Sequence, residues 1–387
     1  MSESGNVKAV QPLVYIAHRS ENLPKVWGIT SAERLRRVFG RLGALEADEN
    51  TIQKAPQSQP VVVISDDHVY DKPILSGLLE NKNTAIEGPE TGQPVAVHTT
   101  AKHFKTALEW LNGADKKPTG TKTKTAAEVG SSFNDDLRKK EQPYCMSLEK
   151  GNMKAIEHRI FMGTYKGVTD VVTKYVWPRP AMVVTRWCAN LGITPNMVTI
   201  AGVLLMLQAL YLFWQGEYVL GLVAGWIFTF FDTVDGKLAR VQFTSSRLGH
   251  VLDHGTDLIH PPFWYFAWAA GLSHVGMPLS EAAFTALMII IIGGYIFQRV
   301  QEGYFIVRFG MHMHIWRRFD SFFRLITTRR NPNMVLMTAC VLLGRPDWAI
   351  WAIAGWTVIS ILVHMEQIIT AEVRNLRGRP VRSWLSQ

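Results

Sequence analysis

The sequence predicts a multi-domain protein, in which an α-helical integral membrane bundle of six transmembrane helices follows a small cytoplasmic α/β domain. From about residue 197 onward, apolar runs approach the ~20 residues that a helix needs to cross a bilayer. Residues 1–150 instead carry mixed charge and only short apolar runs. Basic residues gather beside the apolar runs, and such residues favour the cytoplasmic side of a membrane.

The N-terminal part alternates strand-like and helix-like segments. Leu13 to Ala17 and Val61 to Ser65 are short, β-branched runs typical of buried strands of a parallel sheet. Ser31 to Phe39 has the pattern of a capped amphipathic helix, and Ala101 to Leu111 predicts another. The alternation indicates an α/β domain. We expect it in the cytoplasm, because the N-terminus lacks the basic and apolar regions of a secretory signal.

Composition shifts predict four parts, namely an α/β domain at residues 1–115, a linker at 116–152, interfacial amphipathic helices at 153–193 and the membrane bundle at 194–387. The six spans are placed near residues 197–215, 218–240, 248–272, 281–302, 333–344 and 347–369. The fifth is too short alone, since about 12 residues give about 18 Å against a ~30 Å core. It must begin upstream of Pro332 or be shielded by protein.

The charge balance indicates a membrane partner. The chain carries a formal net charge of +9, with its basic residues beside apolar segments, which favours anionic lipid headgroups and phosphates over nucleic acid. By the positive-inside rule, both termini lie in the cytoplasm, and we expect a multi-pass protein of a bacterial inner membrane. Three distant cysteines form neither a disulfide framework nor a thiolate metal site.

Four aspartates lie where one apolar segment ends and the next begins. Asp232 and Asp235 are three residues apart, and Asp253 and Asp257 are four apart, so each pair shares one helix face. Acids at a membrane edge are costly unless they are neutralised, which indicates a functional site. Carboxylates suit Mg²⁺ or Mn²⁺, and four of them suit two such ions bridged by phosphate oxygens.

Small and basic residues complete the pattern. Gly236 and Gly249 leave room for a ligand beside the helix backbone, and Arg240 offers a guanidinium to a phosphate. With Ala239, the string is D-x2-D-G-x2-A-R-x8-G-x3-D-x3-D. It resembles in full the motif of the CDP-alcohol phosphotransferase family, and the resemblance covers roughly residues 150–387.

The resemblance implies an enzyme of phospholipid or sphingolipid synthesis that transfers a substituted phosphate from a CDP-linked donor to an acceptor hydroxyl and releases CMP. It implies metal ligands at Asp232, Asp235 and Asp253, and a proton acceptor at Asp257. The sequence leaves open whether Asp257 is the base or a fourth metal ligand. The candidate nucleotide or phosphate contacts are Gly236, Ala239, Arg240, Gly249, Asn196 and Thr199, the last two of which equally suit helix capping. A homodimer is also implied.

Two substrate pairs remain open. The segment from Ser245 to Gly255 is similar to choline and ethanolamine phosphotransferases, which favours a soluble donor and a lipid acceptor. Alternatively, CDP-diacylglycerol donates a phosphatidyl group to a polar alcohol such as inositol phosphate. The candidate acceptor-binding residues are Arg308, Arg317, Arg318, Arg329 and Arg330, which equally suit headgroup contact.

The N-terminal domain resembles a reduced nucleotidyltransferase. Asp66, Asp67 and His68 follow the second strand, but the segment after the first strand has one glycine, Gly28, where that family carries a Gly-rich loop. We therefore predict a catalytically inactive accessory domain. The competing classes for the whole chain are a transporter, which would need internal repeats, and a membrane-anchored scaffold without catalysis.

Overall fold

The structure is a computed structural model that describes residues 11–20, 22–134, 137–244 and 247–386, without the side chains of residues 150, 247, 248 and 250–254. The chain forms two compact units. Residues 1–134, 140–163 and 241–243 belong to the first unit, and residues 135–139, 164–240 and 244–387 belong to the second. Each unit has its own hydrophobic core.

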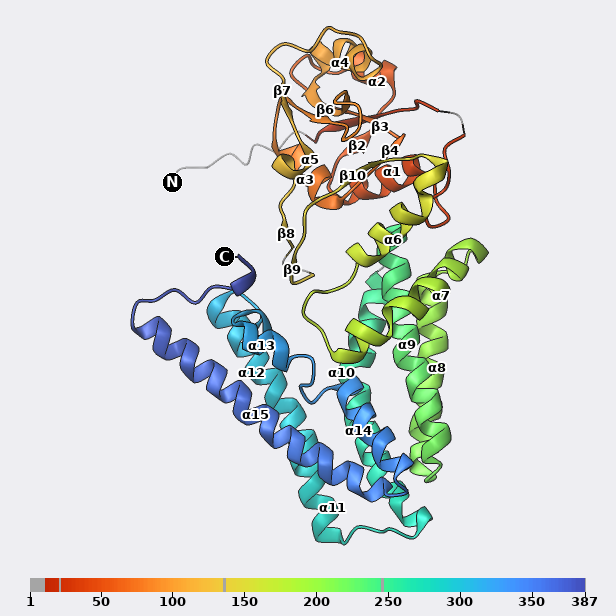
Figure 1. Cartoon of the computed structure of the whole chain (residues 1–387), viewed down its shortest axis with the longest axis vertical. Coiled ribbons are helices and arrows are strands. Elements are labelled where there is room, and N and C mark those ends of the chain that lie inside the picture. The colour runs from red at the N-terminus through yellow and green to blue at the C-terminus, as the bar shows by residue number, and fades with distance from the viewer. Residues whose placement is uncertain (1–10, 21, 135–136, 245–246, 387) are drawn as a thin grey trace, which may run out of the picture. The chain divides into compact units, whose positions relative to one another are not determined.

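The first unit contains most of the strands (Figure 1). Along the chain, the strands are β1 (Leu13–Ala17), β2 (Leu45–Glu46), β3 (Pro60–Ser65), β4 (His68–Tyr70), β5 (Thr84–Glu87), β6 (Pro94–Thr100), β7 (Lys122–Lys124), β8 (Phe133–Asn134), β9 (Lys139–Lys140) and β10 (Cys145–Ser147). The helices are α1 (Ser31–Arg41), α2 (Glu49–Lys54), α3 (Lys72–Glu80), η1 (Ala101–His103), α4 (Phe104–Leu111), α5 (Ala126–Val129), η2 (Lys150–Asn152) and α6 (Met153–Gly163).

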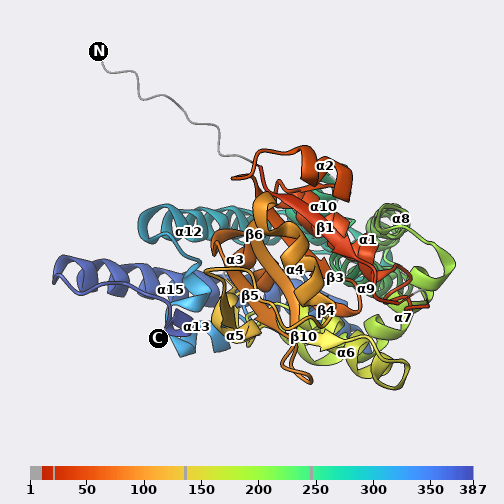
Figure 2. The ribbon, with the colours of Figure 1, turned by 90° about the horizontal axis from the view of Figure 1, so that it is seen from above.

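Six strands form a mixed sheet in the order β2-β1-β3-β6-β5-β7 (Figure 2). The pairs β1–β2, β1–β3 and β5–β7 are parallel, whereas β3–β6 and β5–β6 are antiparallel. The predicted parallel strands are thus present as β1 and β3, but the complete sheet is mixed. The predicted linker at 116–152 contributes β7 to this sheet and β10 to an antiparallel ribbon with β4.

Helices cover both faces of the sheet, because its strands are apolar on both sides. On one face, Val62 and Ile64 pack with residues of α1 and α3 such as Leu35 and Leu75. On the other face, Val61 and Val63 pack with residues of α2 and α4. The predicted helix at 31–39 is confirmed as α1, whose N-cap Thr30 accepts a hydrogen bond from the Glu33 backbone.

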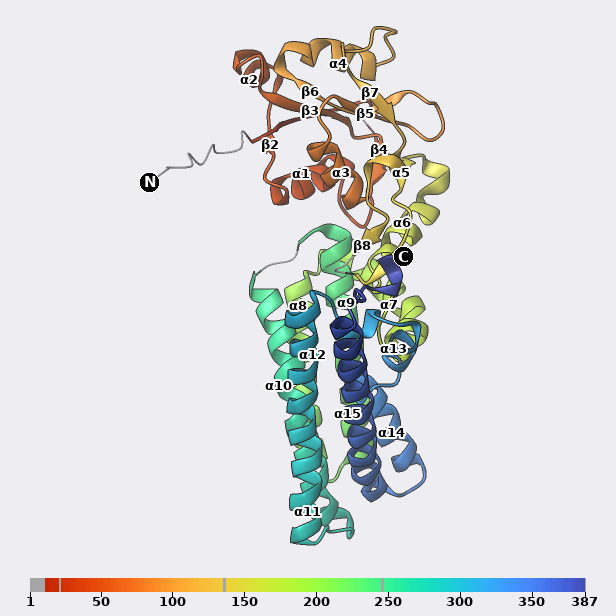
Figure 3. The same ribbon diagram turned by 90° about the vertical axis from the view of Figure 1, so that its left-hand side faces the viewer.

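The second unit is helical (Figure 3). Its elements are η3 (Val172–Val176), α7 (Pro178–Leu191), α8 (Pro195–Trp214), α9 (Tyr218–Gln242), α10 (Arg247–Gly271), η4 (Leu272–Val275), α11 (Glu281–Met288), η5 (Ile289–Gly293), α12 (Gly294–Phe309), η6 (Met313–Ile315), α13 (Arg318–Phe323), α14 (Arg330–Leu342), α15 (Pro346–Leu376) and η7 (Trp384–Ser386). Helix α8 packs along α10, and both α12 and α14 pack along α15.

Four helical segments of the described chain are long and apolar enough to cross a membrane, which supports an integral membrane protein. These segments are Pro195–Trp214, Tyr218–Gln242, Glu281–Phe309 and Pro346–Leu376. The other two predicted spans correspond to α10 and α14, and a six-span bundle stays a prediction. Helix α14 has 13 residues, which at about 1.5 Å each cannot cross a ~30 Å core. It begins upstream of Pro332, and Asn331 to Met334 are buried in protein.

Glycine allows α12 and α15 to approach closely. A Cβ at Gly294 would lie 2.4 Å from Cγ2 of Thr357 and 3.1 Å from Cδ1 of Ile361. The neighbouring Gly293 has no described atom within 4 Å of its Cβ position. Small residues at such contacts let membrane helices pack backbone against backbone.

We predict that Gly294→Ala destabilises the second unit by roughly 1–3 kcal/mol, because an added methyl overpacks the contact with Thr357. The measurement is the apparent melting temperature of the full chain in detergent. The matched control, Gly293→Ala, should melt like the wild type. Equal melting temperatures for the two variants would show that the α12–α15 contact is looser than described.

Candidate active site

A cavity of about 470 Å³ in the second unit is lined by residues of α9, α10, α12 and α14 and by residues between 166 and 173. Its lining combines carboxylates with lysines and arginines. The lining residues are Lys166, Thr169, Asp170, Thr173, Asp232, Thr233, Gly236, Lys237, Arg240, Asp257, Leu258, Pro261, Tyr295, Arg299, Arg329, Arg330 and Asn331. The cavity can therefore hold a ligand that carries both cations and phosphates.

Two motif aspartates from different helices converge on one guanidinium. Arg330, the first residue of α14, donates from Nη2 to Asp232 of α9 and from Nη1 to Asp257 of α10, each at 2.5 Å. The Asp232 side chain is 14% exposed, whereas that of Asp257 is 47% exposed. The carboxylates that the sequence places 25 residues apart thus face one point of the cavity.

Asp235 lies one turn after Asp232 on α9 and is buried. Its Oδ2 accepts a hydrogen bond of 2.5 Å from the Thr199 hydroxyl. Its Oδ1 is buried and has no hydrogen-bond partner among the residues that the structure describes. A buried carboxylate oxygen without a partner is costly, which makes it a candidate ligand atom for a cation. The fourth aspartate, Asp253, has a side chain outside the described part of the chain.

The small and basic motif residues occupy different positions. Gly236 and Arg240 line the cavity, and a Cβ at Gly236 would meet the Arg240 guanidinium at 3.7 Å. Ala239 on α9 and Gly249 on α10 are half-buried and are not among the described lining residues. Asn196 lies in the first turn of α8, also outside the lining.

Thr199 and Lys237 each make a hydrogen bond within the second unit close to the motif residues of α9. The Thr199 hydroxyl donates to Asp235 and not to the cavity itself, so it orients a candidate ligand. Lys237 is buried, and its Nζ donates to the Thr164 carbonyl at 3.1 Å and lies 3.2 Å from the centre of the Tyr165 ring. Both contacts fix the position of the Lys237 side chain in the lining of the cavity.

The cavity also has a basic wall, formed by Lys166, Arg299 and Arg329. Of the five arginines predicted for an acceptor, Arg329 and Arg330 line the cavity. The remaining three are engaged elsewhere. Arg308 binds Glu372, Arg317 binds Asp320 and Glu366, and Arg318 lies over the Trp384 ring.

Several lining residues were not predicted from the sequence, among them Asp170, Asn331 and Arg299. Asp170 is buried and accepts hydrogen bonds from Asn331 and from the Thr173 backbone. Burial would raise the pKa of Asp170, but Arg324 and these hydrogen bonds lower it below its ordinary value, so the carboxylate stays charged. No spacing rule links residue 170 to the motif. Arg299 had a usable signal, because it is a charged residue within a predicted span.

The acid pair of the first unit is engaged by its neighbours. His18 contacts Asp66 at 2.6 Å, and Asp67 contacts His68 at 2.5 Å and the Ser65 hydroxyl. Burial would raise the pKa of Asp67, but the hydrogen bonds from His68 and Ser65 lower it to about 2. These contacts explain both acids as parts of a local hydrogen-bond network.

Comparison with known proteins agrees with the motif. Residues 192–362 match the family model CDP-alcohol phosphatidyltransferase. Archaetidylinositol phosphate synthase of Pyrococcus horikoshii is 35% identical over 94 residues, which are 24% of this chain and 50% of that protein. Phosphatidylinositol phosphate synthase of Mycobacterium bovis is 38% identical over 77 residues, 20% of this chain and 36% of that protein.

A eukaryotic relative and a solved structure also match. Cholinephosphotransferase 1 of Gallus gallus is 38% identical over 129 residues, 30% of this chain and 36% of that protein. The chain thus spans half or less of the length of these three curated relatives. The crystal structure of Mycobacterium tuberculosis phosphatidylinositol phosphate synthase in apo form has a TM-score of 0.37 and 20% identity, covering 49% of this chain and 95% of that one.

The matched region contains Asp232, Asp235 and Asp257, together with Arg330, which joins two of them. The motif D-x2-D-G-x2-A-R-x8-G-x3-D-x3-D lies complete within this region. Residues 192–362 of this chain therefore belong to the CDP-alcohol phosphatidyltransferase family.

Proposed function

We propose that the chain transfers a substituted phosphate group from a CDP-linked alcohol to a hydroxyl group and releases CMP. The observation that carries this proposal is the convergence of Asp232 and Asp257, from two helices, at one cavity within the family-matched region. In the reaction, the acceptor oxygen bonds to the β-phosphorus, the bond from that phosphorus to the CMP oxygen breaks, and the acceptor proton passes to a base.

Two Mg²⁺ or Mn²⁺ ions fit the donor set. Asp232, Asp235, Asp253 and Asp257 offer hard oxygen ligands, and the unpartnered Oδ1 of buried Asp235 supports this assignment. When bound, such ions polarise phosphoryl oxygens and neutralise the leaving phosphate.

The remaining roles follow from position. Of the two cavity carboxylates that Arg330 joins, that of Asp257 is the more exposed. We assign Asp257 as the proposed base for the acceptor hydroxyl. The Arg240 guanidinium lies next to Gly236, which has no side chain, and both residues line the cavity. Arg240 is therefore the proposed partner of the nucleotide phosphates. Thr199 holds Asp235. Ala239 and Gly249, from the motif, and Asn196, from the start of α8, stay proposed donor contacts.

The basic wall favours a phosphorylated acceptor. Arg299, Arg329 and Lys166 line the cavity beyond the motif, and guanidinium groups match the geometry of a phosphate. Two relatives are named as synthases of inositol phosphate lipids. We therefore favour phosphatidyl transfer from CDP-diacylglycerol to a phosphorylated polar alcohol such as inositol phosphate.

A second candidate uses a soluble CDP-alcohol and a lipid hydroxyl. The match to Cholinephosphotransferase 1 favours it. An apolar groove of about 450 Å³ suits an alkyl chain in either case, and it is lined by Met206, Leu207, Leu210, Gly255, Thr256, Ile259, His260, Phe263 and Trp264. This groove shares α10 with Asp257, so a lipid held there would lie near the carboxylates.

The cellular setting is also proposed. We place the chain in a bacterial inner membrane as a homodimer, with both termini in the cytoplasm and a catalytically inactive N-terminal domain. The engagement of Asp66 and Asp67 by neighbouring side chains supports the last point.

The two substrate pairs can be separated by mass spectrometry of the lipids that the purified chain forms from CDP-diacylglycerol or CDP-choline, each with inositol phosphate, inositol and diacylglycerol. We expect a phosphatidylinositol phosphate and CMP from the first donor. A phosphocholine lipid from the second donor would instead support the second candidate. Absence of CMP release with every combination would remove the enzyme proposal.

Metal removal tests the proposed ions. We expect EDTA to reduce CMP release to background and added Mg²⁺ or Mn²⁺ to restore it, because otherwise the carboxylates repel the diphosphate. A monovalent salt at equal ionic strength is the control and should restore nothing. Turnover that persists in EDTA would exclude a readily removable metal.

The base assignment predicts different losses at two aspartates. Asp257→Asn should retain nucleotide and metal binding while turnover falls at least about 100-fold, because the proton acceptor is lost. Asp232→Asn should lose both binding and turnover. Asp347→Asn, which alters an Asp–Arg pair outside the cavity lining, should resemble the wild type. Near-normal turnover of Asp257→Asn would rule out its role as the base.

A further inference from the structure

Glu302 of α12 is a carboxylate that supports the basic wall of the cavity without being among its described lining residues. Its Oε2 lies 3.3 Å from Nη1 of Arg299, and its Oε1 accepts a hydrogen bond from Nη2 of Arg329. Both arginines do line the cavity. One acid therefore holds two cationic groups that come from different elements, α12 and the segment before α14.

One face of α12 also connects the two arginines to the segment that carries Asp257, the proposed base. Tyr295, Arg299 and Glu302 follow one another at i, i+4 and i+7 and so share a helix face. The Arg299 guanidinium lies 5.2 Å from the centre of the Tyr295 ring, and the Tyr295 hydroxyl donates to the Leu258 carbonyl at 3.0 Å. Leu258 follows Asp257 directly, so the arginines are fixed relative to the carboxylate that faces the acceptor.

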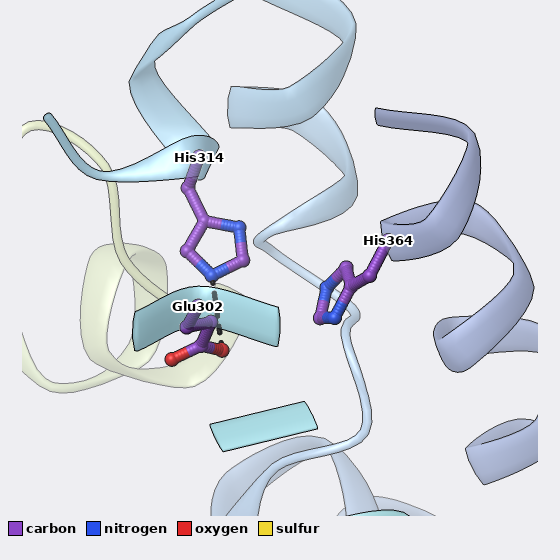
Figure 4. A group of neighbouring side chains, drawn as sticks. All are labelled: Glu302, His314 and His364. Atoms are coloured by element: carbon purple, nitrogen blue, oxygen red, sulfur yellow. Dashed lines mark hydrogen bonds and ion pairs between the residues drawn. The ribbon is translucent and has the colours of Figure 1, made fainter. Parts of the chain in front are cut away.

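His314 also contacts the Glu302 carboxylate. Nε2 of His314 lies 3.4 Å from Oε1 of Glu302 (Figure 4). Burial lowers the pKa of His314 well below its ordinary value, although the hydrogen bond to Glu302 opposes this, so the ring is neutral. The Glu302 side chain is 16% exposed. Half-buried and engaged on both oxygens, the Glu302 carboxylate has little freedom to turn away from the arginines.

A metal ion is the competing explanation for this group. Glu302, His314 and His364 bring ligand atoms within 4.8 Å of one another, and neither ring nitrogen of buried His364 has a partner among the described residues (Figure 4). However, Glu302 is already neutralised by two guanidinium groups. A divalent cation would add two positive charges beside them, which the one carboxylate cannot offset. The charge balance favours arginine positioning over metal binding.

We propose that Glu302 is a positioning residue that fixes Arg299 and Arg329 to bind the phosphate of the acceptor, and so makes the enzyme select phosphorylated over unphosphorylated alcohols. This inference rests on the proposed transfer to a phosphorylated acceptor. Without Glu302, the two guanidinium groups would repel each other and separate, and a phosphate would have to gather them on binding. Acceptor affinity would fall, while donor binding would not change.

The test is the steady-state kinetics of Glu302→Gln in detergent with Mg²⁺, CDP-diacylglycerol, and either inositol phosphate or inositol as acceptor. We expect the KM for inositol phosphate to rise at least about tenfold, with kcat and the KM for the donor near wild type. The matched control is Glu372→Gln, which removes a Glu–Arg pair between α15 and α12 whose Arg308 is outside the described lining. It should leave every parameter unchanged.

A combined variant keeps the inference testable if Glu302→Gln does not fold. Glu302→Gln with Arg299→Gln and Arg329→Gln removes all three charges, and its KM for inositol phosphate should equal that of Arg299→Gln with Arg329→Gln, because Glu302 acts only through the two arginines. Additive effects would overturn the positioning role. An unchanged KM in Glu302→Gln would overturn it too, with the proposed function intact. A wild-type enzyme that uses no phosphorylated acceptor would overturn both.

Discussion

Charge pairing across three helices is the constraint on which the second unit depends. The Asp232 carboxylate is largely buried, where an unpaired charge is costly, whereas the Asp257 carboxylate is half-exposed. Arg330 reaches both carboxylates from the start of α14 and offsets part of that cost. Buried Asp235, whose Oδ1 has no hydrogen-bond partner among the described residues, adds a third carboxylate beside them. These carboxylates are the candidate ligands for cations.

On the basic wall, one carboxylate pairs with two guanidinium groups. Arg299 and Arg329 share Glu302, which leaves a positive excess toward the cavity. Carboxylates and guanidinium groups that line one cavity suit a ligand set of metal ions, diphosphate and a further phosphate. Glu302 offsets part of the positive charge of the two arginines, so a residue outside the described lining supports residues within it.

The sequence could predict those parts of the site that lie close together in the chain. The motif spacing placed Asp232 and Asp257 on helix faces, and the regular geometry of a helix sets the direction of each side chain. Asp170, Arg299 and Asn331 reach the cavity from separate elements, and no local periodicity encodes that approach. In the first unit, β1 and β3 were predictable as strong apolar runs, whereas β7 is the polar segment Lys122–Lys124, which becomes a strand only by pairing with β5.

Helix α14 is shorter than a regular membrane span, and its first residues line the cavity. A continuous span would bury its first turn in lipid, where Arg330 and Asn331 could not be tolerated without partners. Instead, Arg329 to Asn331 line the cavity, and Asn331 and Asn333 bond to Asp170 and Tyr265 inside the protein. Non-helical backbone such as the segment before α14 is tolerated in a membrane protein where it faces a polar cavity and not lipid. The same irregularity brings a guanidinium to both motif helices, so a longer, regular fifth span would remove the site.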